Sequence, residues 1–229
     1  DTFSPASLMK VPLMIAYFKW AEREPAILAR RLSFNGAVDR NARQSIKPSH
    51  SLTPGKSYTV EDLIFRMIVY SDNNAALVLH ANINETYLLS VYRTLGIDKP
   101  SMQRGPCTLS IKTYSSVFRI LFNASYLGHD FSERALRYLL QSDFQGGIVA
   151  GVPASVAVAH KFGECRTNDQ QLIQFHDCGI VYYPRQPYLL CIMSRGTDIT
   201  TLDQKITDIS RILYAELTQA EESMTAAAN

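Results

Sequence analysis

The stretch Ser7-Leu8-Met9-Lys10-Val11-Pro12 places a serine and a lysine three positions apart at the beginning of an apolar run. Residues 7–24 are expected to form a helix, and apolar side chains nearly all round its first turns predict that it is buried. Proline is tolerated early in a helix but breaks its interior, so Pro25 marks the expected end. The spacing then puts the Ser7 hydroxyl and the Lys10 amine on one face.

Two further short motifs follow in the chain. Ser71-Asp72-Asn73 comes after a predicted helix that Thr59 caps and that runs through Val69. Lys161-Phe162-Gly163 lies in a run rich in β-branched and aromatic residues, which is typical of a strand. Each motif alone is weak evidence because such short patterns occur by chance, although Ser-Asp-Asn is the rarest of the three. The evidence for a shared site lies in the order of the three motifs and in the helices and strand predicted around them.

The rest of the pattern predicts an α+β fold, with a helical part packed on an antiparallel sheet and a C-terminal helix. Residues 33–56 are polar and rich in turn residues, so loops and short strands are expected there. Further helices are predicted over residues 74–81, 86–95, 112–123, 132–140 and 201–220, and strands over residues 156–163, 175–183 and 188–194. Residues 1–145 and 146–229 are expected to form the two parts of one compact catalytic unit.

Composition excludes several classes of protein. The chain has 229 residues, of which 46% are hydrophobic and 19% charged, and a formal net charge of only +2. It has no basic block and no interleaving of aromatic and basic residues, so nucleic acid is not an expected partner. The longest apolar stretch, residues 11–18, is too short to cross a bilayer.

The four cysteines do not follow a metal-ligand spacing. Buried free thiols are the simpler interpretation, since isolated cysteine is among the most buried residue types. The alternative is a disulfide between Cys165 and Cys178, which flank the turn between two predicted strands. A disulfide would fit an oxidising compartment.

The three motifs supply the groups that nucleophilic catalysis needs. A serine hydroxyl is a weak nucleophile at neutral pH and requires a nearby base. Lys10 could be that base for Ser7 if burial and a second cation, Lys161, favour its neutral form. The alternative for the first motif is a capping serine with a surface lysine, and Ser71-Asp72-Asn73 would also serve as a helix-capping turn.

Taken together, the motifs resemble those of the serine β-lactamase and penicillin-binding protein superfamily. Residues 3–12, 150–153 and 179–182 are similar to the family's entry into its central helix, its approach to the catalytic strand and its next strand. The surroundings of the site look closest to the class A β-lactamases. The resemblance covers nearly the whole chain.

The resemblance implies a role for each motif residue. Ser7 would be the nucleophile, Lys10 its base and Ser71 the proton relay to the leaving group. Asn73 would hold Lys10 and the substrate's acyl-side amide, while Asp72 would secure its own loop. Lys161 would orient Ser71 and attract the substrate carboxylate.

The resemblance also implies a substrate-binding strand edge made of Lys161, Phe162, Gly163 and Glu164, together with Asn73. Gly163 would leave room for the substrate along this edge. The backbone N–H groups of Ser7 and Glu164 would form the oxyanion hole.

Two departures from the family stand out. Class A enzymes carry a deacylating glutamate on a loop that corresponds to residues 96–110 here, and this stretch contains Asp98 but no glutamate. Phe162 replaces the family's Thr or Ser, so carboxylate recognition would depend on Lys161 and on one of Arg166, His176 or Arg195. A surface or hairpin role is the simpler interpretation for each of these three.

The expected function is therefore hydrolysis of β-lactams through a Ser7 acyl-enzyme, with slow deacylation. The alternatives are a penicillin-binding D-Ala-D-Ala carboxypeptidase or transpeptidase acting on peptidoglycan, and a non-catalytic module that binds peptidoglycan or a partner. The chemistry implies no metal and no organic cofactor. The family's substrates lie outside the cytoplasm, which predicts a periplasmic or secreted protein.

The family also implies elements upstream of the first motif. Its members carry an N-terminal helix and two strands before Ser-x-x-Lys, and here only six residues precede Ser7. Without those strands, residues 188–194 would form an exposed apolar sheet edge, which natural folds avoid. We expect that part of the natural N-terminus is missing from this sequence, or that another segment covers the edge.

Overall fold

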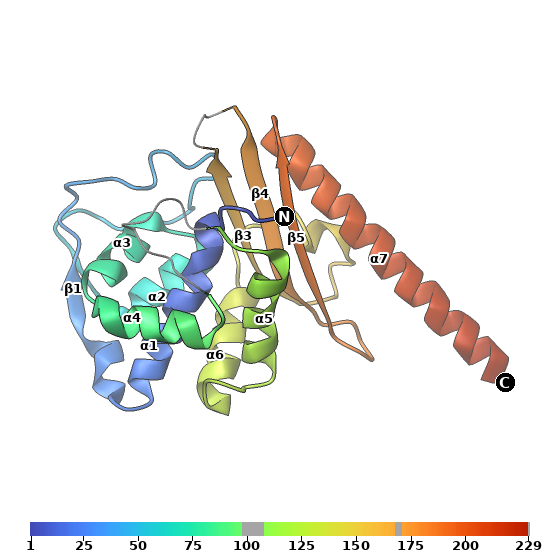
Figure 1. Cartoon of the computed structure of the whole chain (residues 1–229), viewed down its shortest axis with the longest axis horizontal. Coiled ribbons are helices and arrows are strands. Elements are labelled where there is room, and N and C mark those ends of the chain that lie inside the picture. Colours follow the sequence, from blue (N-terminus) through green and yellow to red (C-terminus); the bar gives the residue numbers. More distant parts are fainter. Residues whose placement is uncertain (98–107, 168–170, 229) are drawn as a thin grey trace.

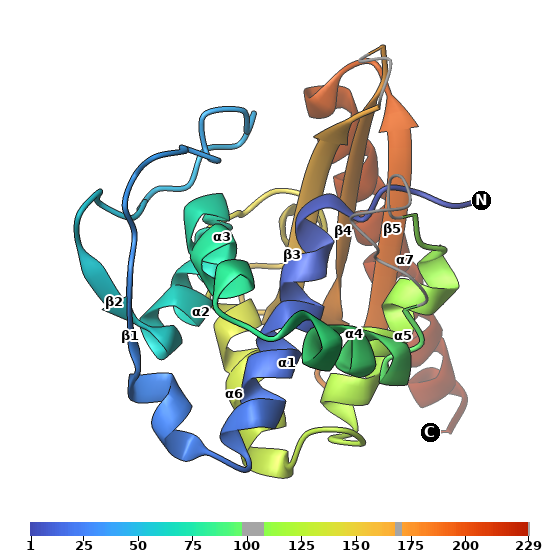
Figure 2. The same ribbon diagram turned by 60° about the vertical axis from the view of Figure 1, so that its left-hand side comes forward.

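A computed structural model describes residues 1–97, 108–167 and 171–228. Helices α1 to α6 lie on one side of an antiparallel sheet, and the long helix α7 lies on the other side (Figures 1 and 2). Each face of the sheet carries its own hydrophobic core. The larger core joins the sheet to the helical layer, and the smaller one joins it to α7. The expected α+β arrangement is confirmed.

Helix α1 (Lys10–Ala21) is the centre of the helical layer and follows the short 3₁₀ helix Ala6–Met9. Apart from Lys10, its buried side chains are apolar on every side, as predicted for a helix surrounded by others. The helices around it are α2 (Val60–Val69), α3 (Asn73–Ala81), α4 (Glu85–Thr94), α5 (Ile111–Phe122) and α6 (His129–Leu140). The Thr59 hydroxyl accepts a hydrogen bond from the Asp62 N–H at 3.1 Å, so the predicted cap of α2 is confirmed.

The motif Lys161-Phe162-Gly163 lies on the first strand of a three-stranded sheet in the order β3 (Val158–Arg166), β4 (Ile173–Val181) and β5 (Tyr188–Gly196). Side chains alternate between the two faces, so Lys161 faces the helical layer while its neighbours His160 and Phe162 face the α7 side. The side chain of Lys161 therefore lies between the sheet and the helical layer, in the middle of the fold.

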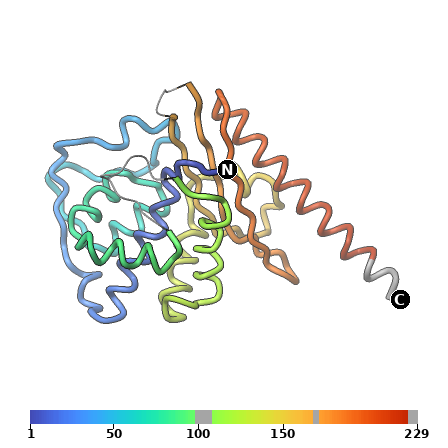
Figure 3. Tube along the Cα trace, in the orientation of Figure 1, coloured from blue at the N-terminus to red at the C-terminus, as the bar shows by residue number. Residues whose placement is uncertain are grey.

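Two short strands, β1 (Arg31–Ser33) and β2 (Ser57–Thr59), pair with each other outside this sheet. The chain between them, residues 34–56, is the polar segment identified in the sequence. It leaves the helical layer and passes the end of β3 (Figure 3). As a result, part of the segment 34–56 lies over the motif residues.

Helix α7 (Ile199–Ala228) differs from expectation along its length. Leu202 and Ile206 are buried against the sheet, whereas Ile209, Ile212 and Leu217 are exposed. The packed face of the helix also includes the buried side chains of Thr207 and Ser210, and Tyr214 and Glu221 contact Tyr183 further along. The predicted apolar face therefore coincides with the packed face only in part. None of the helices described is long and apolar enough to cross a membrane.

The simpler interpretation, buried free thiols, is wrong for Cys178 and Cys191, and the alternative pairing of Cys165 with Cys178 is wrong as well. Cys178 on β4 forms a disulfide with Cys191 on β5, and Cys165 is a free, partly buried thiol. The reason is the register, because Cys178 lies directly opposite Cys191 on β5 while Cys165 lies opposite Gln174. A disulfide needs Cβ atoms that face each other closely, and only the first pair provides this. Cys107 lies outside the described residues.

Candidate active site

Ser7 is held against the sheet by the segment that precedes it. The N–H of Ser4 donates to Gln174 Oε1 at 2.8 Å, and His176 Nε2 donates to the carbonyl oxygen of Ser4 at 2.9 Å. Burial lowers the pKa of His176 to about 4, so this histidine is neutral and structural. His176 was a candidate for carboxylate binding, and its ring is instead used to anchor the chain before Ser7.

Gly163 allows β3 to approach this segment closely. A Cβ atom at this position would lie 3.1 Å from the carbonyl oxygen of Pro5 and 3.2 Å from the backbone nitrogen of Leu8. The glycine thus leaves room for the Ser7 turn rather than only for a substrate. As a result, Ser7 and Glu164 line the same cavities, while the pairing of their N–H groups as an oxyanion hole stays a prediction.

Lys10 and Lys161 converge on Ser71. Lys10 Nζ lies 2.6 Å from the Ser71 carbonyl oxygen and 3.0 Å from its hydroxyl oxygen, and Lys161 Nζ lies 2.9 Å from the same hydroxyl oxygen. Ser71 adopts φ 56°, a left-handed conformation that few non-glycine residues occupy. Such strained backbone clusters at functional sites.

The two lysines perturb each other. Burial, reinforced by the nearby charge of Lys161, holds the pKa of Lys10 well below its ordinary value, while Asp72 and Glu164 oppose this shift. Burial lowers the pKa of Lys161 to about 7, against the opposing charge of Asp177. Amines whose pKa values are lowered in this way are what a general base and a proton relay require.

Lys10 is directed to Ser71 rather than to Ser7. Among the described residues no hydrogen bond joins the Ser7 hydroxyl to Lys10, although both line one cavity of about 290 Å³. In unliganded sites such catalytic bonds are often long and tighten only when substrate binds. The expected general-base pairing therefore remains a prediction that the shared cavity supports.

Asp72 secures the turn that carries Ser71, as the resemblance implied. Its buried carboxylate accepts hydrogen bonds from the side chain of Asn41 and from the N–H groups of Leu52, Asn74 and Ala75, at 2.8 to 3.3 Å. These bonds tie the loop before β2 to the start of α3. The carboxylate is satisfied within the protein and faces no substrate.

Asn73 behaves differently from expectation. Its side-chain nitrogen lies 3.4 Å from the carbonyl oxygen of Arg40, and the structure describes no hydrogen bond from it to Lys10. Its N–H donates to Asn41 Oδ1 at 2.8 Å. The side chain still lines both cavities beside Ser7, so it is placed to meet a substrate.

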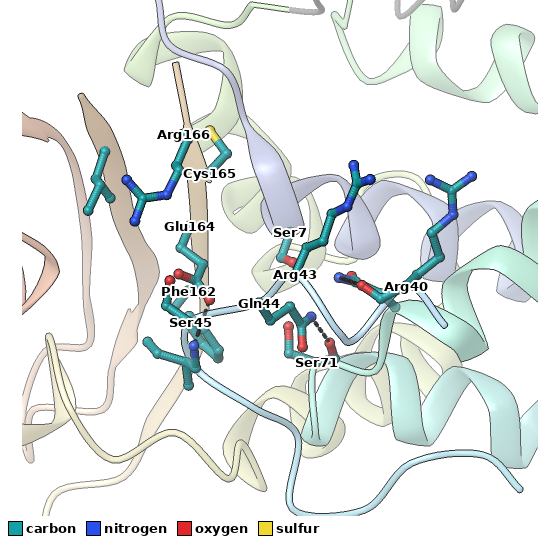
Figure 4. A pocket seen from close by; sticks show the side chains of 13 residues that line it. Ser7, Arg40, Arg43, Gln44, Ser45, Ser71, Phe162, Glu164, Cys165 and Arg166 are labelled. Carbon is teal, nitrogen blue, oxygen red and sulfur yellow. Dashed lines mark hydrogen bonds between the residues drawn. The ribbon is translucent and has the colours of Figure 1, made fainter. Parts of the chain in front are cut away.

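A loop of residues 40–46 closes one side of the site, and sequence reasoning missed it. Gln44 Nε2 donates to the Ser71 carbonyl oxygen at 3.0 Å, and the N–H of Ile46 donates to Glu164 Oε1 at 2.7 Å. The loop thus spans from the Ser71 turn to the edge of β3 (Figure 4). Only its polar composition signalled that it lies at the surface.

This loop and β3 enclose a second cavity of about 220 Å³ at Ser7. Arg40 and Arg43 line it from the loop and Arg166 lines it from the end of β3 (Figure 4). Of the three sequence candidates for carboxylate binding, only Arg166 is at the site. Arg195 instead lies over the ring of Phe3, away from the cavity.

Phe162 is packed rather than open to solvent. Its ring lies 4.3 Å from that of Phe144, and Lys161 Nζ lies 4.1 Å from its centroid. The ring also forms part of the wall of the 220 Å³ cavity. A phenyl ring at this position shapes the cavity wall and makes a cation–π contact, but it cannot donate a hydrogen bond to a substrate.

A buried pair behind the site was also missed. His160 Nδ1 lies 2.9 Å from Asp177 Oδ1, and both side chains are almost wholly buried on the α7 side of the sheet. The N–H of Ile148 donates to Asp177 Oδ2 at 2.9 Å. The negative charge of Asp177 raises the pKa of Lys161, so this buried carboxylate influences a lysine on the opposite face of the sheet.

Asp98 and the remainder of the stretch that would carry a deacylating group, up to residue 107, lie outside the described residues. Within the described residues no group of three His, Cys, Asp or Glu side chains could hold a metal ion.

A family model described as the beta-lactamase enzyme family matches residues 1–217. The chain belongs to this family. No curated protein matches the sequence of this beta-lactamase family member.

Solved structures show the same fold at low sequence identity. PBP-A has a TM-score of 0.77 and 19% identity, and the match covers 96% of this chain and 83% of PBP-A. A mutant of PBP-A, in an acyl-enzyme complex with penicillin G, has a TM-score of 0.77 and 20% identity over 96% and 83% of the two chains. The class A beta-lactamase from Mycobacterium abscessus has a TM-score of 0.76 and 20% identity over 95% and 86%. The family member described here therefore has the fold of class A β-lactamases and of a penicillin-binding protein.

Proposed function

We propose that this protein opens β-lactam rings by forming an acyl-enzyme on Ser7. One observation carries the proposal: two buried lysines lie within 3.0 Å of the Ser71 hydroxyl oxygen, beside Ser7, in a chain of the beta-lactamase family. Burying two amines without a carboxylate in direct contact is costly for stability. A fold that retains them has a chemical use for them.

The proposed reaction begins with the neutral amine of Lys10. It takes the proton of the Ser7 hydroxyl as the serine oxygen attacks the lactam carbonyl carbon. The carbon–nitrogen bond of the ring then breaks, and the leaving nitrogen receives a proton from the Ser71 hydroxyl, which Lys161 replenishes. The product is an ester of Ser7 that retains every atom of the β-lactam. Water hydrolyses this ester in the second half of the reaction.

Deacylation is proposed to be slow. Residues 96–110 contain no glutamate, and Glu164 is the only carboxylate among the described residues that line the two cavities at Ser7. Its Oε1 atom already accepts a hydrogen bond from Ile46. General-base assistance is typically worth about 10²- to 10⁴-fold, so its loss leaves a long-lived ester.

The second candidate is a penicillin-binding D-Ala-D-Ala carboxypeptidase or transpeptidase, which the glutamate-free stretch favours. A peptidoglycan- or partner-binding module without catalysis is disfavoured, because binding alone requires no buried lysine pair. All three candidates act outside the cytoplasm in our proposal. The Cys178–Cys191 disulfide supports that location, since such bonds persist in oxidising compartments.

The test is intact-protein mass spectrometry over time after mixing with benzylpenicillin or a chromogenic cephalosporin, with absorbance followed in parallel. We expect an adduct of the full penicillin mass that persists while the chromogenic substrate turns over slowly. The Ser7→Ala variant should form no adduct. Failure of the wild-type protein to form an adduct with either compound would reject the proposed acylation.

A further inference from the structure

The cavity at Ser7 has an excess of positive charge on its walls. Three arginines and a single glutamate line it. No carboxylate among the described residues lies within ion-pair distance of Arg40, Arg43 or Arg166, whereas Arg66 and Arg134 elsewhere are paired. The glutamate, Glu164, is engaged by the N–H of Ile46. The guanidinium groups are therefore available to a ligand.

The arginines come from two opposite walls. Arg40 is fixed next to the catalytic turn, because its N–H donates to Asn74 Oδ1 at 2.8 Å and its carbonyl oxygen accepts from Asn73. Arg43 follows on the same loop and extends beside Ser7, while Arg166 extends from the last position of β3 (Figure 4). A ligand in this cavity is flanked by positive charge on both sides.

One carboxylate does not neutralise this arrangement. A carboxylate pairs with one guanidinium in a bidentate manner, so a substrate with a single negative charge would leave two arginines without a counter-ion. Lys161 is fully buried and does not line the cavity, so it does not compete for the charges of a ligand there. Clefts lined by one sign of charge concentrate ligands of the opposite sign.

We propose that Arg40, Arg43 and Arg166 make the Ser7 cavity selective for substrates with at least two anionic groups, one of them a carboxylate on the acyl portion. This inference rests on the proposed function, because it names the substrate class of the same site. It applies equally to a β-lactam and to a peptide with a free side-chain carboxylate.

The test uses three penicillins with the same bicyclic nucleus. Benzylpenicillin has a neutral acyl side chain, carbenicillin adds a carboxylate to it, and ampicillin adds an ammonium group. Rate constants for formation of the Ser7 adduct are measured by mass spectrometry at low and high salt. We expect carbenicillin to react about tenfold faster than ampicillin at low salt, at the lower end of what a charged cleft provides, and the ratio to shrink at high salt.

A pair of matched variants locates the effect. Arg40→Gln/Arg43→Gln should bring the carbenicillin to ampicillin ratio near one. Arg119→Gln/Arg137→Gln removes the same charge from exposed positions on α5 and α6 and should leave the ratio unchanged. Equal rates for the three penicillins in the wild-type protein, or a ratio that survives in the first variant, would overturn the inference.

A binding measurement separates this inference from the proposed function. If no penicillin acylates the protein, the proposed function fails, and the Ser7→Ala protein is titrated with carbenicillin and benzylpenicillin by calorimetry. Tighter binding of carbenicillin that is lost in the Arg40→Gln/Arg43→Gln background would still support selectivity for dianions. Equal binding, or no binding of either compound, would reject it.

Discussion

Lys10 and Lys161 donate hydrogen bonds to the same oxygen atom, the hydroxyl of Ser71, at 3.0 and 2.9 Å. Two ammonium groups at this separation in a buried site repel each other, so one of them gives up its proton easily. The structure assigns the stronger reasons for neutrality to Lys10, which is buried and also faces the charge of Lys161. We therefore expect Lys10 to be the neutral base of the pair and Lys161 to be the cation.

The pH profile of acylation should be bell-shaped. As the pH falls, Lys10 gains a proton and no longer activates Ser7. As the pH rises through about 7, Lys161 loses its proton and can no longer return a proton to the Ser71 hydroxyl. Rate constants for adduct formation between pH 5 and 9 check this. A rate that keeps rising above pH 8 would show that the charge of Lys161 is not required.

The variant Lys161→Met should be inactive but more stable. In the folded protein the pKa of Lys161 is about 7, below its unfolded value near 10.5, so folding disfavours the charged form. This destabilisation is absent above about pH 10, grows as the pH falls, and is complete below about pH 7, where it reaches up to about 5 kcal/mol.

Urea unfolding of Lys161→Met and of the wild-type protein at pH 6 and at pH 9.5 tests the sign. The advantage of the variant should be largest at pH 6 and should shrink toward pH 9.5. Lys205→Met, which changes an exposed lysine, is the matched control and should show no such trend. An advantage that grows with pH contradicts the assignment.

Asp177→Asn should move the alkaline limb of the acylation profile to lower pH. The negative charge of Asp177 raises the pKa of Lys161, so its removal lowers that pKa further below about 7. His160→Gln is the matched control, because it removes the same hydrogen bond and keeps the carboxylate. Equal displacement of the limb in both variants would mean that packing, and not charge, is responsible.

Loss of the Cys178–Cys191 disulfide should destabilise the sheet. The bond closes a loop with a sequence separation of 13, and such a loop typically contributes about 3 kcal/mol. Cys178→Ala/Cys191→Ala should lower the free energy of unfolding by this amount, while Cys165→Ala should change it little. Alkylation of the denatured protein before reduction should label Cys165 and spare the other two. Labelling of Cys178 without reductant would contradict the pairing.

The sequence predicts the local structure of the candidate site well because each motif is local. Ser7 and Lys10 are joined by one helical turn, and the Ser71-Asp72-Asn73 turn is defined by its own caps. The meeting of Lys10 and Lys161 at Ser71 follows from the family resemblance and is confirmed by their contacts to the Ser71 hydroxyl. Most helices and strands begin and end within a few residues of the predicted positions.

What the sequence does not predict depends on tertiary register. The partner of Cys178 is set by how β4 and β5 align, and the spacing of the cysteines does not reveal this alignment. The exposure of Ile209 and Ile212 depends on which face α7 turns toward the sheet, because periodicity alone assigns them to a covered face while Ser210 is the residue buried there. Arg40 and Arg43 reach the site only because a long loop folds back over it.

The loop of residues 40–46 touches the Ser71 turn at Gln44 and β3 at Ile46, yet it contributes none of the groups assigned to acyl transfer. Two of the three arginines proposed to select a substrate, Arg40 and Arg43, therefore lie in a different part of the chain from the residues proposed to transform it. Substitutions in the loop can alter which molecules enter while the Ser7, Lys10 and Ser71 arrangement stays as it is. Such a division lets an enzyme acquire new substrates by successive changes at a tolerant surface segment.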